Sequence, residues 1–127
     1  MSVPENLRYS ESHEWVRNDG DGVVTVGITD FAQEKMTELV YVELPEADSE
    51  VAAGDELAVV ESVKSASDIY SPVSGVVVDA NSALEDDPTL VNSDPYGDGW
   101  LFRIRVSDST ALDAMMDTAA YTKLISE

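Results

Sequence analysis

Residues 59–72 give the clearest indication of the fold and read Val59-Val60-Glu61-Ser62-Val63-Lys64-Ser65-Ala66-Ser67-Asp68-Ile69-Tyr70-Ser71-Pro72. Apolar, strand-forming residues lie on both sides of a short centre of small and polar residues. If the two apolar runs pair, the chain must reverse direction between them, so we expect strands at about 56–63 and 65–71. Lys64 would then stand at or next to the tip of a β-hairpin, with its ammonium group in solvent.

The lysine at this tip allows two interpretations. A charge at a hairpin tip can keep an exposed turn soluble and discourage association between strand edges. Lysine is scarce in this chain, however, and the others are Lys35 and Lys123. A lysine with small neighbours on a tight turn is also a good attachment point for a group that must reach away from the body. The stretch alone does not separate the two interpretations.

The composition excludes several kinds of chemistry. A chain of 127 residues predicts a single domain, 1–127. It has no cysteine, which excludes disulfides, thiolate metal sites and a cysteine nucleophile. Its single histidine, His13, gives little support to a metal site or a Ser-His-Asp triad. The glycines do not fall in the order of a phosphate-binding loop. We therefore predict no metal and no catalytic residue.

The net charge of −19 limits the partners and the location. Nucleic acids and anionic membranes are bound by clustered Lys and Arg, which this chain lacks. No apolar run approaches the ~20 residues of a membrane-spanning helix, and residues 1–6 do not resemble a signal peptide. We therefore expect a cytoplasmic protein. The acidic surface is interpreted as an adaptation to high salt, with an acidic face for a basic partner as the alternative.

The rest of the chain predicts a mainly β fold. A short helix is expected at about 31–37, because Asp30 is followed three residues later by Gln33, as in a capping box. Residues 46–54 are interpreted as an acidic loop, and the helical spacing of Ala, Leu and Met predicts helices within 108–127. A brief helical piece is expected at 81–85, and further strands at 7–9, 14–17, 23–28, 39–44, 76–78 and 100–106. Many short strands at close spacing favour a flattened antiparallel β-sandwich or barrel.

A covalently loaded lysine is the chemistry that suits this chain best. Carboxylates are too numerous to single out an acid–base pair, and a lysine at an exposed tip stays protonated. An amide at Lys64 would remove its charge and turn the side chain into a long flexible arm. The small residues 65–67 would leave room for a modifying enzyme. If the cargo were lipoate, its dithiolane would supply the sulfur chemistry that a chain without cysteine lacks; biotin is the competing cargo.

Several segments resemble the H proteins of the glycine cleavage system. Residues 61–68 resemble the lipoylation segment of that family, and the other matching segments keep the family's order and spacing from about residue 7 to 125. They lie at 12–16, 26–33, 40–45, 71–75, 90–97 and 99–101. Two residues depart from the family's usual pattern. Ser65 stands where alanine is usual, and Thr37 stands where glycine is common, so we expect that this turn needs no strongly positive φ.

The resemblance implies a lipoyl carrier and not an enzyme. Covalent lipoate would be attached to Lys64. The neighbouring cofactor-binding residues would be Glu61, Ser62, Val63, Ser65 and Ser67. The family's fold is a flattened antiparallel sandwich of the lipoyl/biotinyl-like hybrid type, with a short early helix and C-terminal helices, which agrees with the strand pattern. The hairpin core would span about 56–71.

The resemblance also implies partners and a cleft. In the family, the arm accepts an aminomethyl group from a pyridoxal-phosphate glycine decarboxylase and presents it to a tetrahydrofolate-dependent aminomethyltransferase. Dihydrolipoamide dehydrogenase reoxidises the arm, and a lipoate-attaching enzyme supplies the lipoyl group. The loaded arm folds back into a cleft, whose matching residues here are Ser12, Glu14 and Asp68; carboxylates suit an arm that bears an amine. For His13 and Trp15 we expect packing or surface roles.

Other interpretations use the same lysine or no modification at all. An H-like protein that relays lipoyl groups to other apoproteins is the alternative function. Lipoyl domains of 2-oxoacid dehydrogenases lack the Ser-His-Glu-Trp segment at 12–15 and the C-terminal helices. Biotin carriers usually flank the lysine with methionines, whereas this chain has Val63 and Ser65. An unmodified β interaction module is the remaining hypothesis.

The salt hypothesis predicts that the protein becomes more stable as the salt concentration rises. At ~1 M salt the Debye length falls to ~3 Å, which screens the repulsion among the acidic side chains. The midpoint of thermal unfolding should therefore increase between dilute buffer and ~1 M KCl. A midpoint that stays constant or falls would refute the hypothesis.

Overall fold

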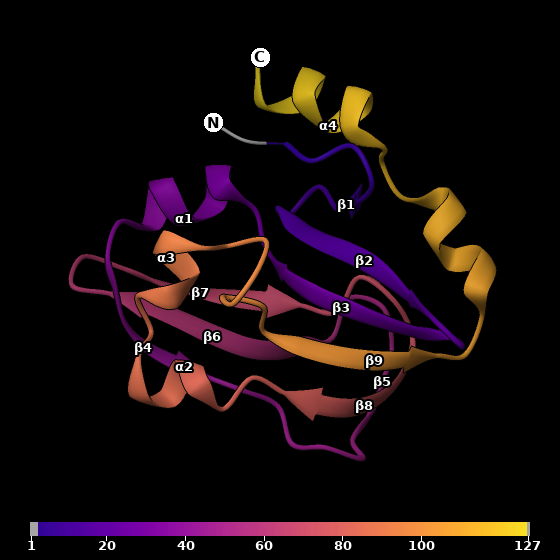
Figure 1. Cartoon of the computed structure of the whole chain (residues 1–127), viewed down its shortest axis with the longest axis horizontal. Coiled ribbons are helices and arrows are strands. Elements are labelled where there is room, and N and C mark those ends of the chain that lie inside the picture. The colour runs from indigo at the N-terminus through magenta and orange to yellow at the C-terminus, as the bar shows by residue number, and fades with distance from the viewer. Residues whose placement is uncertain (1–2, 127) are drawn as a thin grey trace.

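Two antiparallel β-sheets form the body of the computed structural model, which describes residues 3–126 (Figure 1). The strands are β1 Arg8–Tyr9, β2 Glu14–Gly20, β3 Val23–Ile28, β4 Leu39–Glu43, β5 Glu50–Val51, β6 Glu56–Ser62, β7 Ala66–Tyr70, β8 Gly75–Ala80 and β9 Phe102–Val106. One sheet has the strand order β1-β2-β3-β9-β8-β5 and the other has the order β4-β6-β7. The predicted flattened antiparallel fold is confirmed. The strand β5 lies inside the segment that we expected to be a loop.

Short helices occupy the ends of the sheets and the C-terminal region. They are α1 Asp30–Met36, α2 Ala83–Asp86, α3 Leu90–Ser93, the 3₁₀ helix η1 Ser109–Ala114 and α4 Thr118–Ile125. The helices predicted within 108–127 are confirmed up to the end of α4, and residue 127 lies outside the described part of the chain. Among residues 3–126, no helix has the length and apolar character that crossing a membrane would require.

Helix α1 begins one residue earlier than the sequence suggested. Thr29 is its N-cap, because the Thr29 hydroxyl accepts a hydrogen bond from the backbone N–H of Ala32 at 3.2 Å. The prediction of Asp30 as the cap is therefore wrong. Asp30 is the first helical residue, and its carboxylate accepts a hydrogen bond from Gln33 Nε2 at 2.6 Å. A threonine and an aspartate in succession both suit a cap, and the local sequence does not rank them.

The main core fills the space between the two sheets. Strand β6 shows the expected alternation, with Ala58, Val60 and Ser62 buried and the residues between them more exposed. Strand β3 is buried along nearly its whole length. Valines and isoleucines from both sheets meet in this core, including Val16, Val24, Val26, Ile28, Val42, Val60, Ile69, Val77 and Ile104.

A second apolar cluster attaches the C-terminal helix. The Tyr9 ring from β1 stacks on the Tyr121 ring from α4, with 4.6 Å between the ring centroids. Trp15 is fully buried in the same cluster, and its Nε1 donates to the carbonyl oxygen of Pro95 at 2.9 Å. The expected packing role of Trp15 is confirmed. A Cβ atom at Gly27 would lie 2.7 Å from the Trp15 ring, so position 27 must be glycine while tryptophan occupies position 15.

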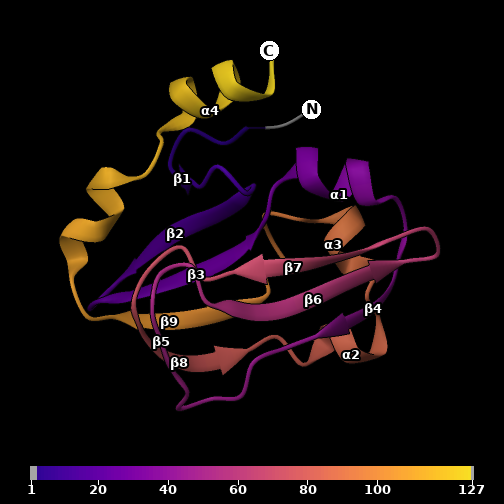
Figure 2. The same ribbon diagram turned by 180° about the vertical axis from the view of Figure 1, so that it is seen from behind.

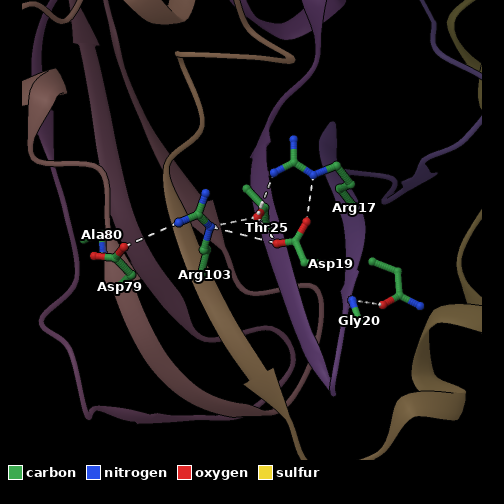
Figure 3. A network of polar contacts seen from close by, with 8 residues as sticks. Arg17, Asp19, Gly20, Thr25, Asp79, Ala80 and Arg103 are labelled. Carbon is green, nitrogen blue, oxygen red and sulfur yellow. Dashed lines mark hydrogen bonds and ion pairs between the residues drawn. The ribbon is translucent and has the colours of Figure 1, made fainter.

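A polar network crosses the outer face of the six-stranded sheet (Figure 3). The hydroxyl of Thr25 on β3 donates to the carboxylate of Asp19 and accepts from Arg103 Nε at 3.1 Å. Arg17 Nε bonds to Asp19 at 2.8 Å, and Arg103 pairs with Asp79 on β8 at 3.5 Å. Burial would raise the pKa of Asp19, but the hydrogen bonds from Thr25 and Arg17 and the two guanidinium charges outweigh it and lower that pKa. The network therefore links β2, β3, β9 and β8.

The turn after α1 contains an unexpected backbone conformation. Thr37 has φ +66° and ψ −162°, a combination in a region of the Ramachandran plot that is populated almost only by glycine. The expectation that this turn needs no positive φ is wrong. The Thr37 N–H donates to the carbonyl oxygen of Gln33 at 3.0 Å, and its own carbonyl accepts from Asn92 Nδ2 at 2.8 Å. Asn92 also accepts a hydrogen bond from the Leu39 N–H at 2.9 Å, so this one side chain of α3 bonds to the backbone at two positions of the turn.

Replacing this threonine by glycine should stabilise the protein. Glycine adopts positive φ without the clash that a Cβ atom causes, so Thr37→Gly is expected to raise the free energy of unfolding by about 1 kcal/mol. Urea denaturation would measure the change. Thr89→Gly is the control at a position with an ordinary φ of −69°, where glycine adds backbone entropy to the unfolded state and removes the hydrogen bond from the Thr89 hydroxyl to Asp87. A loss of stability in both variants would contradict the argument from strain.

Candidate functional site

Lys64 lies in the turn of the β6–β7 hairpin, as predicted. The two strands pair up to Glu61 and Ala66, and the Ser62 N–H then donates to the carbonyl oxygen of Ser65 at 2.8 Å. Ser62 Oγ accepts from the Ser65 N–H at 3.3 Å, so the turn is closed by hydrogen bonds on both sides. Lys64 itself is exposed. The turn protrudes at one end of the molecule, next to α1 and α3 (Figures 1 and 2).

The residues around the lysine divide into a buried base and an exposed tip. Ser62 is 8% exposed, whereas Val63 is 89% exposed beside the lysine. Glu61 and Ser67 are half-buried on the two strands. The Ser65 hydroxyl donates to Met36 Sδ on α1 at 3.8 Å. The serine that departs from the usual alanine therefore connects the hairpin to α1.

A cleft lies between α1, the loop before β2 and the strands β6 and β7. Its volume is about 350 Å³, which is in the range of ligand-binding pockets. The lining is mostly apolar, with two hydroxyls, one imidazole and one ammonium group as its polar members. The lining residues are Ser12, His13, Ile28, Phe31, Ala32, Lys35, Met36, Val60, Ser67 and Ile69. Such a cleft suits a long hydrocarbon chain with a polar end.

The structure brings Ser12 and Glu14 together at this cleft. Glu14 is 1% exposed and lies behind Ser12. Its Oε1 accepts from the hydroxyls of Ser10 and Ser12, both at 2.5 Å. Its Oε2 accepts from the Tyr70 N–H at 3.4 Å, which links the loop to β7. The carboxylate therefore both holds the loop and contributes negative charge close to the cleft.

Asp68 does not lie with these two residues. It is exposed, and its β7 neighbours Ser67 and Ile69 line the cleft from the other face of the strand. Asp68 instead lines a separate hollow with Glu43, Leu44, Glu56, Leu57, Ala58 and Val59. In this structure Asp68 therefore lines a different hollow from the one that Ser12 lines. Its position in the motif indicated proximity, but the strand geometry decides which face a side chain occupies.

The cleft also contains residues that the sequence interpretation missed. Phe31, Ala32, Lys35 and Met36 all line it from α1. Counted from Phe31, the other three lie one, four and five residues further on, so all four share one face of the helix. This spacing could have identified them as a set from the sequence. The Lys35 ammonium group lies 5.2 Å from the centroid of the Phe31 ring. No such helical spacing surrounds His13, for which we expected a packing or surface role.

His13 lies in the wall of the cleft. Its ring centroid is 4.8 Å from that of Phe31, and its Nδ1 is 2.8 Å from the hydroxyl of Tyr121. Burial is the largest influence on its pKa and lowers it. The negative charge of Glu14 acts in the opposite direction, and the positive charge of Lys35 lowers the pKa further. The net result is a pKa below the usual value for histidine, which favours the neutral imidazole.

Comparison with known proteins identifies the family. The family model described as glycine cleavage H-protein matches residues 7–127. This chain belongs to that family. Glycine cleavage system H proteins of Shewanella sp. (strain W3-18-1) and Halorhodospira halophila are 55% and 54% identical to it over 126 and 125 residues. These alignments cover 99% and 98% of this chain and 98% and 96% of the relatives.

A solved structure of an H protein has the same fold. The crystal structure of a glycine cleavage system H protein from Mycobacterium marinum superposes with a TM-score of 0.89 at 36% identity, covering 98% of this chain and 100% of that one. Membership of the H-protein family confirms that the chain is a carrier protein of the glycine cleavage system and not an enzyme. Proteins of this family carry a lipoyl group.

Removing the buried carboxylate should destabilise the cleft wall. Glu14→Ala would leave the hydroxyls of Ser10 and Ser12 and the Tyr70 N–H without their shared acceptor, at an expected cost of about 1–3 kcal/mol in the free energy of unfolding. Urea denaturation would measure it. Glu11→Ala, an exposed position in the same loop, is the control and should change stability little. Equal effects of the two substitutions would show that the Glu14 hydrogen bonds contribute nothing.

Proposed function

We propose that this H-family chain carries lipoate as an amide on Lys64 and shuttles an aminomethyl group. The observation that carries the proposal is the position of Lys64, which is exposed in a hydrogen-bonded turn at the end of a paired hairpin. The turn gives the modified side chain a fixed base. Val63 beside the lysine is also exposed, so this part of the turn is open to an approaching enzyme. If Lys64 were only a charge that keeps the turn soluble, the membership of this chain in a carrier family would be left unexplained.

The proposed cycle has three partners besides the enzyme that attaches lipoate. A pyridoxal-phosphate glycine decarboxylase loads the aminomethyl group, and a tetrahydrofolate-dependent aminomethyltransferase removes it. Dihydrolipoamide dehydrogenase then reoxidises the dithiol to the disulfide, the form that accepts the next group. The chain supplies no catalytic group in this cycle. We further propose that residues 1–127 form one carrier domain that works in the cytoplasm, as length and composition suggest.

The cleft provides a place for the loaded arm between partners. Its apolar wall, including Ile28, Phe31 and Ile69, suits the hydrocarbon part of a lipoyl chain. Ser12 offers a hydroxyl at the surface of the cleft, and the buried Glu14 behind it supplies negative charge for an amine. Enclosure of this kind would shield a reactive aminomethyl group from water.

Intact mass tests the attachment site. After expression with a lipoate-attaching enzyme and lipoate, the wild-type chain should gain the mass of one lipoyl group, and Lys64→Arg should gain none. Lys35→Arg and Lys123→Arg are the matched controls, because they change the other lysines and should be modified normally. An unmodified wild-type chain, or a lipoylated Lys64→Arg chain, would refute the proposal.

Glycine–bicarbonate exchange with the decarboxylase then tests the shuttle. The lipoylated wild-type chain should support exchange, and Lys64→Arg should not, although it keeps the fold and the charge of the turn. A lipoylated chain that supports no exchange but transfers its lipoyl group to another apoprotein would favour the relay function.

A further inference from the structure

His13 has a strained backbone at the wall of the cleft. Its φ is +72°, a left-handed conformation that a residue with a Cβ atom adopts only at a cost. Two hydrogen bonds hold it there, from the His13 N–H to the carbonyl oxygen of Ser10 at 3.1 Å and from the Thr29 N–H to the carbonyl oxygen of His13 at 3.0 Å. Strain that is maintained beside a ligand-sized cleft indicates a functional constraint on the residue.

A chain of hydrogen bonds connects the His13 ring to the start of α1. Thr29 Oγ1 accepts from the Ala32 N–H at 3.2 Å and lies 2.7 Å from the Tyr121 hydroxyl, which lies 2.8 Å from His13 Nδ1. We assign the protons so that each hydroxyl accepts once and donates once. Thr29 then donates to Tyr121, and Tyr121 donates to His13 Nδ1. This order leaves the imidazole neutral, with its proton on Nε2.

We propose that Tyr121 is a positioning residue of the arm-binding cleft, holding His13 as a neutral ring whose Nε2–H binds an acceptor atom of the docked arm. Among the described residues, Nε2 has no hydrogen-bond partner, whereas Nδ1 is engaged by Tyr121. A lipoyl arm offers an amide oxygen and sulfur atoms as acceptors. Helix α4, which lies outside the cleft, thereby completes it from behind. This inference rests on the proposed docking of the lipoyl arm.

The charges around His13 give the contact a pH dependence. Glu14 and Lys35 are the charged groups near the ring, from β2 and α1, while Tyr121 on α4 and Ser67 on β7 are uncharged. Burial and Lys35 lower the pKa of His13 more than Glu14 raises it. As the pH falls through that pKa, Nδ1 becomes a donor and can no longer accept from Tyr121. A second cation then lies beside Lys35, so an arm that bears a protonated amine should dock less well.

Nuclear magnetic resonance can follow His13 directly, because it is the chain's single histidine and gives one C2–H signal. In the unmodified chain, the titration midpoint should lie below the usual histidine value, and Tyr121→Phe should move it upward. Tyr9→Phe is the matched control: Tyr9 stacks on Tyr121, but its hydroxyl bonds to the carbonyl oxygen of Pro4. An unchanged midpoint in Tyr121→Phe, or an equal change in Tyr9→Phe, would overturn the positioning role.

The lipoylated chain tests the contact with the arm. Lipoylation should shift the His13 C2–H signal and change its titration midpoint, because the docked arm replaces water beside the ring. The change should be smaller in Tyr121→Phe. An identical signal in unmodified and lipoylated wild-type chains would overturn the contact, even where intact mass verifies the lipoyl group. A chain without a lipoyl adduct would instead refute the proposed function, while the titration of unmodified variants still tests Tyr121.

Discussion

The β6–β7 hairpin packs against the six-stranded sheet, and this packing positions both the lysine turn and the cleft. Val60 and Ile69, one from each hairpin strand, are 0% and 4% exposed and belong to the main core. The same two residues line the cleft beside α1. Core and cleft therefore share a wall. Because that wall is packed, the turn that carries Lys64 has a fixed base, and the surface next to it keeps a fixed shape.

Much of this arrangement could be predicted from the sequence, because it follows from local patterns. Two apolar runs around a small-residue centre define the hairpin, and the turn between them places Lys64. Strand β5 was hidden because its two residues are too few to show alternation, and only pairing with β8 identifies it. Thr37 was misjudged for a similar reason. Its positive φ is accompanied by a hydrogen bond from Asn92 on α3, 55 residues away in the sequence.

The candidate site was predictable only in part. Ser12 and Glu14 are two residues apart, so their contact needs little tertiary information. The side on which Asp68 lies was less predictable, because alternate residues of a strand face opposite sides and the sequence does not state which side meets the loop before β2. The link between His13 and Tyr121 spans 108 residues, and no local pattern could reveal it. The short motifs of the family are thus readable in the sequence, whereas the surroundings of the cleft depend on long-range packing.

The contact between Trp15 and Gly27 limits how this protein can change over evolutionary time. The indole ring occupies the volume that any side chain at position 27 would need, so substitutions at the two positions are coupled. A larger residue at position 27 becomes acceptable only after the Trp15 ring has been lost. Losing the ring first leaves a void in the second apolar cluster. Each single step passes through a less stable protein. The pair is therefore expected to persist or to change together, and it lies next to the junction of the loop and β2 at which His13 and Glu14 stand.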